Sequence, residues 1–166
     1  MLKKIILCVS LIGFIQPAFS ETRPLISDGM RGLTTNACVE LVRKVEAKMI
    51  KNLPIRTHPI INQDDPKNNV FSATTIVDYN GNDSQVNMSV IPVKNSCNVV
   101  YMETFVRSEP CIISREKILK KWNFVGKLNE TMVFNFRRDD KFFGYLTPQG
   151  FNSSCLISKR RVFYGE

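Results

Sequence analysis

The chain contains very little histidine. His58 is the only one in 166 residues, and it lies in a polar stretch between Thr57 and Pro59. Mechanisms that need two histidines are therefore excluded, and any histidine-dependent base or nucleophile would have to use this side chain. We interpret His58 as an exposed loop residue.

Motifs for several reaction classes are also missing. The sequence has no nucleophile elbow, no glycine-rich phosphate loop, no His-Glu-x-x-His helix and no calcium-binding loop. The acidic pairs Asp64-Asp65 and Asp139-Asp140 leave a carboxylate-dependent hydrolase, or weak metal binding, as a minor alternative. Adjacent aspartates in polar segments are more often turn-forming residues. We therefore predict a protein that is not an enzyme and that has no cofactor.

Long hydrophobic runs are absent except at the N-terminus. A basic start that includes Lys3 and Lys4 precedes an apolar stretch over residues 5–15, and small residues lead to Ser20. This order is typical of a secretory signal peptide, and the stretch is too short for a membrane anchor, which needs about 20 apolar residues. We predict that residues 1–20 are removed and that the protein is exported, to the periplasm or outside a bacterial cell.

The number of cysteines is informative. Cys8 would leave with the signal peptide, so the exported chain keeps Cys38, Cys97, Cys111 and Cys155. An even number of cysteines in an exported protein indicates disulfides. A zinc site is the alternative, but no two of these cysteines have the short spacing of zinc knuckles. We predict two disulfides and no metal site.

The composition excludes a disordered chain. Hydrophobic residues make up 43% of the sequence, and the chain has 11 Phe, 4 Tyr and 1 Trp. Disordered segments have low hydrophobicity and few aromatic residues. The length fits one domain, since domains commonly have about 100–200 residues. After the signal peptide we expect an irregular leader over residues 21–34 and a single folded domain over residues 35–166.

A change of apolar period divides the next segment into a helix and two strands. Apolar residues recur at steps of three and four after Thr35 or Asn36, either of which can cap a helix that ends before Pro54. Residues 54–69 are expected to be a polar connection. The period then becomes two on both sides of residues 80–81.

The two strands are predicted to form a hairpin. Asn80-Gly81 is the residue pair that best tolerates the positive φ angles of a two-residue turn. Such a turn pairs Thr75 with Val86 and Phe71 with Val90, so both apolar sets lie on one face of the hairpin. In the same register, Ala73 lies opposite Met88.

The rest of the chain predicts another helix and four strands. Ser114 can cap a short helix that extends to Trp122, with an acidic residue in its first turn. The strands are expected over residues 98–107, 131–137, 142–147 and 154–164, with turns over 138–141 and 147–150.

The predicted order of elements is αβββ-αβββ. It indicates an α+β fold with antiparallel sheet, two helices and two possible halves, residues 35–108 and 111–166. The cysteines recur with the elements, which suggests the disulfides Cys38–Cys97 and Cys111–Cys155. A strand over residues 98–107 would hold Cys97 and Cys111 tens of ångströms apart, whereas a disulfide needs Cα atoms within about 7 Å.

Positive charge is concentrated in the last third of the chain. The formal net charge is +8, yet residues 21–110 contain ten basic and ten acidic side chains. Residues 111–166 contain eleven basic and five acidic side chains, together with ten of the fourteen aromatic residues that follow the signal peptide. The candidate binding residues are the cations that adjoin aromatic side chains there: Lys120, Lys121, Arg137, Arg138, Lys159, Arg160 and Arg161.

Three interpretations of these cations remain at the level of sequence. Three consecutive cations over residues 159–161 place charge on both faces of a strand, so the strand either lies at a sheet edge that charge protects, presents a binding surface, or is not a strand. As a binding surface it would suit an acidic protein partner, which makes an inhibitor, immunity or adaptor protein our leading hypothesis. Anionic lipid head groups or lipopolysaccharide are the alternative ligands. The export signal makes nucleic acid an unfavourable candidate.

Overall fold

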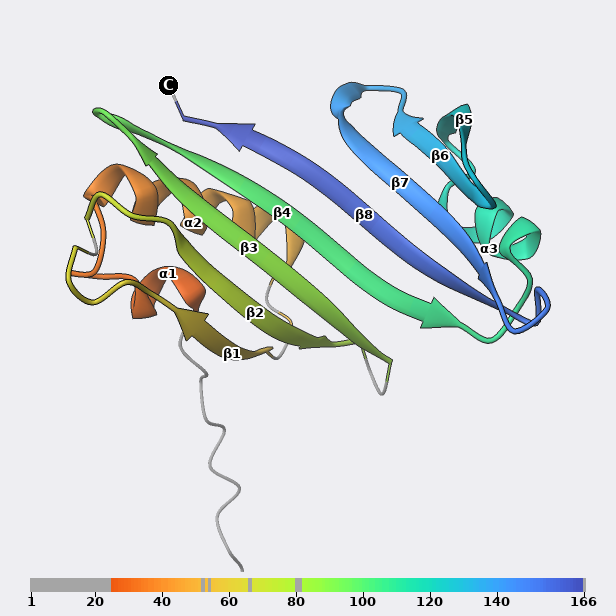
Figure 1. Ribbon diagram of the computed structural model, residues 1–166, viewed down its shortest axis with the longest axis horizontal. Helices are drawn as coiled ribbons and strands as arrows, with labels where there is room; N and C mark the ends of the chain where they lie inside the picture. Colours follow the sequence, from red (N-terminus) through yellow and green to blue (C-terminus); the bar gives the residue numbers. More distant parts are fainter. Residues whose placement is uncertain (1–24, 52, 54, 66, 80–81, 166) are drawn as a thin grey trace, which may run out of the picture.

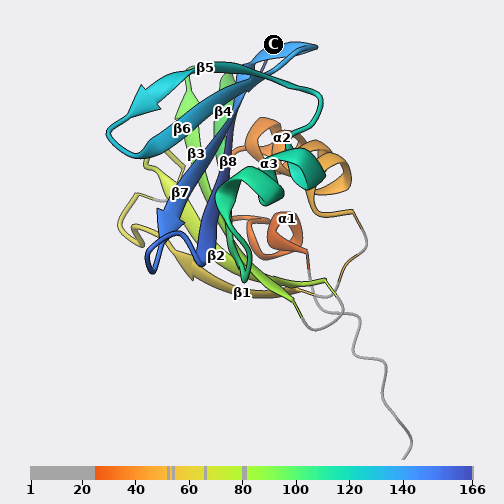
Figure 2. The same ribbon diagram turned by 90° about the vertical axis from the view of Figure 1, so that its right-hand side faces the viewer.

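The computed structural model describes residues 25–51, 53, 55–65, 67–79 and 82–165. The predicted signal peptide and the Asn80-Gly81 turn lie outside the described residues. Within them, the chain forms one eight-stranded antiparallel sheet and three helices (Figure 1). All three described helices gather on one face of the sheet (Figure 2). We call this the helix face and the opposite one the open face.

The elements fall into two halves. The first half contains α1 (Ile26–Gly29), α2 (Asn36–Met49), β1 (Ile55–Ile60), β2 (Phe71–Asp78), β3 (Asp83–Val93) and β4 (Ser96–Arg107). The second half contains α3 (Cys111–Ile118), β5 (Trp122–Leu128), β6 (Thr131–Phe136), β7 (Asp139–Gln149) and β8 (Ser154–Tyr164). Antiparallel strands, helices and two disulfides agree in outline with the predicted α+β class, although strands dominate the fold.

The two halves share one topology and meet at their last strands. The strand order across the sheet is β1-β2-β3-β4-β8-β7-β6-β5, so each half is a four-stranded meander (Figure 1). β4 and β8 run antiparallel at the centre, from the pair Asn98–Tyr164 to the pair Arg107–Cys155. Because equivalent strands pair antiparallel, an approximate two-fold rotation relates the halves.

The residue register makes this two-fold relation specific. Cys97 is the second residue of β4 and Cys155 the second residue of β8, and each lies opposite a proline, Pro92 or Pro148. The strands that carry these prolines, β3 and β7, are both 11 residues long. Counting residues from these cysteines and prolines therefore identifies, for each position in one half, the equivalent position in the other.

Both predicted disulfides are confirmed. Cys38–Cys97 joins α2 to β4 with Cα atoms 5.1 Å apart, and Cys111–Cys155 joins α3 to β8 with Cα atoms 4.9 Å apart. The bridged strand positions are equivalent, so each half fastens one helix to the same face of its last strand.

The first core lies between α1, α2 and the strands β2–β4. Thr35 caps α2, as one of the two predicted choices, and its Oγ1 accepts a hydrogen bond from the Cys38 backbone N–H at 3.3 Å. The core includes buried residues from both layers: Val42, Val45, Ile50, Phe71, Val77, Met88, Val90, Val99 and Tyr101.

A short helix, α1, replaces part of the irregular leader predicted over residues 21–34. Its backbone N–H groups at Ile26 and Ser27 donate hydrogen bonds to the Glu46 carboxylate of α2 at 2.5 and 3.2 Å. The first N–H groups of a helix have no partner inside it, so Glu46 supplies one. Glu46 is only 1% exposed. Burial raises its pKa, and the hydrogen bonds from Ser27 and Ile26 act in the opposite direction.

The second core lies beneath α3. Leu119, Phe134, Leu146 and Ile157 are buried there with Trp122. Gly144 of β7 lies under this cluster, where an added Cβ would be 3.0 Å from Leu119 Cδ1 and 3.2 Å from the Trp122 ring. The absence of a side chain at this position therefore allows the ring to pack directly on the strand.

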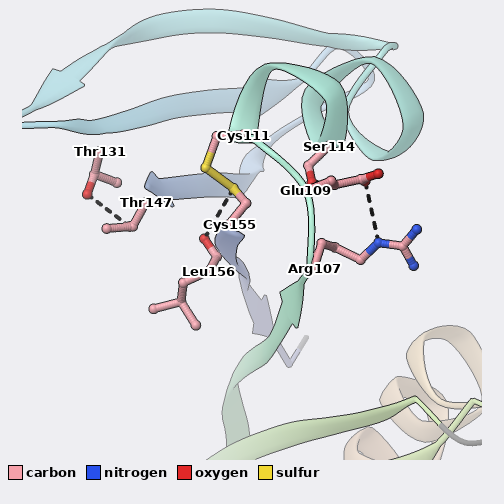
Figure 3. The surroundings of a disulfide bond; sticks show 8 residues. All are labelled: Arg107, Glu109, Cys111, Ser114, Thr131, Thr147, Cys155 and Leu156. Atoms are coloured by element: carbon pink, nitrogen blue, oxygen red, sulfur yellow. Dashed lines mark hydrogen bonds and ion pairs between the residues drawn. A yellow bond between two sulfur atoms is a disulfide. The ribbon is translucent and has the colours of Figure 1, made fainter. Parts of the chain in front are cut away.

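Glu109 fixes the start of α3 beside the second disulfide. Ser114 Oγ donates a hydrogen bond to Glu109 Oε1 at 3.1 Å, and Arg107 Nε lies 3.5 Å from the same oxygen (Figure 3). Lys117 forms a further ion pair with this carboxylate. The hydrogen bond from Lys117, more than the one from Ser114, holds the pKa of Glu109 below its ordinary value.

Each half has four strands rather than the predicted three. The connection predicted over residues 54–69 contains β1, and His58 lies on this exposed edge strand instead of in a loop. Only Ile55 of β1 is buried, so the strand has no apolar period that the sequence could reveal. In the second half, Trp122 begins β5 rather than ending a helix, and α3 starts at Cys111, ahead of the predicted cap at Ser114.

Two predicted turns are displaced. β6 reverses into β7 at residues 137–138 instead of 138–141, and β7 continues to Gln149 through the predicted turn at 147–150. The second reversal uses positive φ angles at Gly150, Phe151 and Asn152. The pairing of β7 with β8 continues through Pro148, which lies directly opposite Cys155. This pairing prevails over the turn preference of the proline.

The register predicted for the first hairpin is confirmed. Thr75 pairs with Val86 and Phe71 with Val90, and the apolar residues of both strands face the first core. The strands expected over residues 98–107 and 154–164 are also present, as β4 and β8.

The disulfides bear on the cellular compartment. Stable disulfides form in oxidising compartments and are rare in the cytosol, so the two bridges indicate a non-cytoplasmic protein. Among the described residues, no helix combines the length and the hydropathy needed to cross a membrane.

Candidate binding cleft between the two halves

A buried ion pair lies on the helix face where the two halves meet. Glu103 of β4 faces Lys159 of β8, and Lys159 Nζ lies 3.2 Å from Glu103 Oε2. The Glu103 side chain is 6% exposed and that of Lys159 is 22% exposed. Tyr79, just after β2, donates its hydroxyl hydrogen to Glu103 Oε1 at 2.8 Å. This carboxylate therefore joins residues of both halves.

A second ion pair lies one step along the same strand. Arg161 of β8 pairs with Asp139, the first residue of β7, and both side chains are largely buried. The Arg161 guanidinium also lies over the rings of Phe163 and Phe142, with its central carbon 4.5 and 5.6 Å from the two ring centres. The quadrupole of an aromatic ring attracts a cation that lies over its face, and this attraction helps to hold Arg161 at the junction.

The two tyrosines near Glu103 remain protonated at physiological pH. Burial is the main cause that raises the pKa of Tyr79 and of Tyr101, and the negative charge of Glu103 raises both further. The Tyr79 hydroxyl is thus available as a hydrogen-bond donor to Glu103, not as a base.

A cleft of about 910 Å³ opens beside these ion pairs, between the C-terminal end of α2 and the start of β7. Five cations and two carboxylates line it: Lys48, Lys51, Arg138, Lys159, Arg161, Glu103 and Asp139. The carboxylates are occupied by Lys159 and Arg161. The other three cations have no ion pair among the described residues, so the cleft carries an excess of positive charge.

Aromatic and aliphatic side chains form the remaining wall of the cleft. Phe136 and Phe142 line it from β6 and β7, Met49 lines it from the end of α2, and Leu53 lines it from the segment that follows. Phe136, Phe142 and Trp122 pack as one cluster, with ring centres 4.8 to 6.1 Å apart. An apolar wall below several convergent charges is the usual composition of a ligand site between two structural units.

The structure does not bring the seven predicted cations onto one face. Lys159 and Arg161 point to the helix face and line the cleft, whereas Arg160 lies on the open face. Arg138 lines the cleft as well, from the turn between β6 and β7. The edge interpretation of residues 159–161 is wrong, because β8 is a central strand that pairs with both β4 and β7. The three consecutive cations fit a central strand because Lys159 and Arg161 form ion pairs on the helix face, while Arg160 lies on the open face.

The other three predicted cations lie outside the cleft. Lys120 and Lys121 are exposed in the link between α3 and β5. Arg137 is exposed in the turn after β6, and its Nε donates a hydrogen bond to Asn123 Oδ1 at 3.1 Å. These side chains surround the end of the second half where β5 starts and β6 ends.

Sequence reasoning missed the contribution of the first half. Lys48 and Lys51 belong to residues 21–110, whose ten basic and ten acidic side chains balance, so the charge of that segment did not indicate a site. Glu103 carried a detectable signal, since it continues the alternation of Val99 and Tyr101 and so places an acid on the apolar side of β4. An acid in that position requires a buried partner. The partner, Lys159, is 56 residues away and could not be identified without the sheet order.

The acidic pairs considered for a hydrolase do not meet. Asp64 and Asp65 lie in the connection between β1 and β2, where Asp65 accepts hydrogen bonds from the Asn68 side chain. Asp139, at the start of β7, is separated from β2 by β3, β4 and β8. Across the described part of the chain, no three His, Cys, Asp or Glu side chains are grouped so that they could hold a metal ion.

Comparisons with protein-family models, with curated proteins and with solved structures give no match to this chain.

Proposed function

We propose that the protein is an exported, non-enzymatic binding protein and that the cleft between its halves receives acidic side chains of a protein partner. The observation that supports this best is the charge of the cleft, where five cations converge and only two carboxylates oppose them. Lys48, Lys51 and Arg138 are left to attract a ligand of opposite charge. Partners of this kind include the target of an inhibitor, immunity or adaptor protein.

The geometry favours a polypeptide over a small anion. The cleft combines lysines that have no ion pair among the described residues with an aromatic wall, a combination that suits a partner with carboxylates next to apolar side chains. Excess positive charge would raise the rate of association with an acidic partner and make binding sensitive to salt.

Charge reversal in the cleft tests this proposal. We expect Lys48→Glu/Lys51→Glu to weaken binding of a fluorescent glutamate-rich peptide by at least about tenfold at low salt, since two attractive charges become repulsive. Fluorescence anisotropy at two salt concentrations measures the affinity. The wild-type affinity should also decrease as salt increases.

Two matched variants control for total charge. Lys67→Glu/Lys94→Glu makes the same charge change in the first half, and Lys120→Glu/Lys121→Glu makes it in the basic second half; none of these four lysines lines the cleft. Both controls should retain most of the affinity. An equal loss in all three variants would reject the cleft as the site, and an absence of peptide binding by the wild type would reject the acidic-partner proposal.

A further inference from the structure

A second hollow lies on the open face, away from the cleft. It is a groove of about 610 Å³ across β5–β8. Its apolar and aromatic lining includes Val125, Leu128, Val133, Phe143, Tyr145, Val162 and Tyr164. Several of these side chains remain accessible, with Val125 56% and Leu128 64% exposed. No described helix covers this face (Figure 2), so the proposed function of the cleft does not account for the groove.

The two-fold relation between the halves provides an internal comparison. Phe143 and Tyr145 lie five and three residues before Pro148, and the equivalent positions before Pro92 are Asn87 and Ser89. Both pairs of positions lie on the open face of a strand next to the central pair. The same fold therefore accepts polar side chains at these positions.

The neighbouring strands show the same difference. Val133 of β6 pairs with Tyr145, and its equivalent, Ser72 of β2, pairs with Ser89. At these three positions the open face of the first half is thus polar where that of the second half is apolar. Since packing does not demand the apolar residues, the groove has the character of a binding surface, which is what a concentrated exposed apolar patch usually indicates.

The charges around the groove are mostly positive. Lys127, Lys141 and Arg160 line it, against the single carboxylate of Asp140. None of these three cations has an ion pair among the described residues, and Lys141 Nζ lies 5.0 Å from the centre of the Tyr164 ring. An apolar groove with unpaired cations is complementary to an apolar ligand that carries negative charge.

The backbone around the groove distinguishes a hydrocarbon chain from a peptide. β6, β7 and β8 are each paired on both sides, so their main-chain groups are used within the sheet. A peptide lying on this face would lose water from its own N–H and C=O groups without gaining partners, which is costly. The edge strand β5 offers few hydrogen-bond partners to a peptide backbone, because its pairing is interrupted by an irregularity between Phe124 and Gly126.

We infer that this groove binds an amphiphile consisting of a single hydrocarbon chain with an anionic head group. The chain lies against Phe143, Tyr145 and the neighbouring aliphatic side chains, and the head group lies near Arg160 and Lys141. The volume falls in the range of roughly 300–1,000 Å³ that is typical of small-ligand sites. A free fatty acid has this chemistry, whereas phosphatidylglycerol and similar anionic membrane lipids carry two chains.

Laurate is a suitable probe, and titration calorimetry below its micelle concentration measures its affinity. We expect the wild type to bind laurate and Phe143→Asn/Tyr145→Ser to bind it at least about tenfold more weakly, because the variant loses most of the aromatic contact area. The variant introduces the residues of the first half, so its circular dichroism should remain that of the wild type. Arg160→Gln should lower the affinity by about two- to fivefold.

The control variant is Asn87→Ala/Ser89→Ala, which alters the equivalent positions and should bind laurate as the wild type does. Dodecyltrimethylammonium, with the opposite head-group charge, should bind more weakly than laurate. No laurate binding by the wild type, or equal binding by the Phe143→Asn/Tyr145→Ser variant, would overturn the inference.

Sedimentation with phosphatidylglycerol vesicles tests the alternative that the groove binds a membrane lipid. Binding of laurate without groove-dependent binding of vesicles supports a free single-chain amphiphile, and groove-dependent binding of vesicles would overturn that assignment. Binding of vesicles without laurate would mean adsorption of a basic surface to a membrane and would refute a site for a single chain. Lys48→Glu/Lys51→Glu alters the cleft and should leave laurate binding unchanged. A wild type that does not bind laurate would therefore refute the groove proposal without bearing on the cleft proposal.

Discussion

At the scale of single residues, buried acids connect segments that are distant in sequence. Glu46 satisfies the first N–H groups of α1, and Glu103 accepts from Tyr79 and pairs with Lys159. In both cases the carboxylate is almost inaccessible to water, so its partners determine whether the arrangement is stable. These contacts fix where the helix and the sheet meet, and they also shape the wall of the cleft.

Glu46 should give stability a characteristic dependence on pH. Its pKa in the folded protein is raised above the ordinary value of 4.5. Between these two values the folded state binds more protons than the unfolded state, so the free energy of unfolding decreases as pH rises, with a limiting slope of about 1.4 kcal/mol per pH unit. Glu46→Gln should remove this contribution. Urea unfolding of both proteins from about pH 3 to pH 8 measures it.

A matched variant separates Glu46 from other acids. Glu109 has a lowered pKa, so its contribution is present above pH 4.5 and is lost as pH falls through its pKa in the folded state. Glu109→Gln should therefore change the pH profile in the opposite direction. Parallel profiles for the wild type and Glu46→Gln would contradict the role given to the buried carboxylate.

At the scale of elements, the two helices depend on their disulfides to different degrees. α2 has 14 residues and a buried apolar stripe, whereas α3 has only 8 residues, of which Cys111 and Ser114 are buried. Isolated helices of that length are unstable in water, so α3 needs tertiary contacts to persist. The Cys111–Cys155 bridge supplies one at its first residue.

Removal of the second disulfide should release α3 more than removal of the first releases α2. We expect Cys111→Ala/Cys155→Ala to lower the free energy of unfolding by about 2–5 kcal/mol, a typical cost for a native disulfide. Amide hydrogens of residues 111–118 should then exchange at least about tenfold faster. Hydrogen exchange followed by mass spectrometry measures both helices. Greater loss of protection in α2 of Cys38→Ala/Cys97→Ala would refute this ranking.

At the scale of the whole molecule, the junction between the halves is polar on the helix face. The two cores are separate, and the Glu103–Lys159 and Arg161–Asp139 pairs lie between them. Removal of one member of a buried ion pair leaves the other charge without a partner, which is more costly than replacement of both. The junction can therefore be tested without disturbing either core.

Lys159→Met should destabilise the protein by about 3 kcal/mol, within the range for breaking a buried ion pair. Glu103→Gln/Lys159→Met should cost less than that single change, because glutamine keeps an acceptor for the Tyr79 hydroxyl and no buried charge remains. Urea denaturation of the wild type, both single variants and the double variant gives the coupling free energy. Additive effects of the two substitutions would show that the pair does not couple the halves.

The sequence contains the information for the local elements that have a strong apolar period. The first hairpin followed in register from the alternation around Val86 and Val90, and the disulfide pairing followed from the recurrence of cysteines with the elements. The edge strands β1 and β5 could not be found in this way. They cover little of the core, so burial leaves no regular pattern in their residues.

The concentration of charge and aromatic residues in residues 111–166 is a property of the sequence alone, as is the scarcity of histidine. Only the tertiary structure decided how those cations are distributed. Pairing of β8 with β4 sends alternate residues to opposite faces, so Lys159 and Arg161 meet acids at the junction while Arg160 enters a separate groove. The tertiary structure also places Lys48 and Lys51, from a half that is neutral overall, in the same cleft as Lys159 and Arg161. The composition determines the number of charges. The alternation of side chains between the two faces of each strand, and the order of the strands in the sheet, determine which charges share a surface.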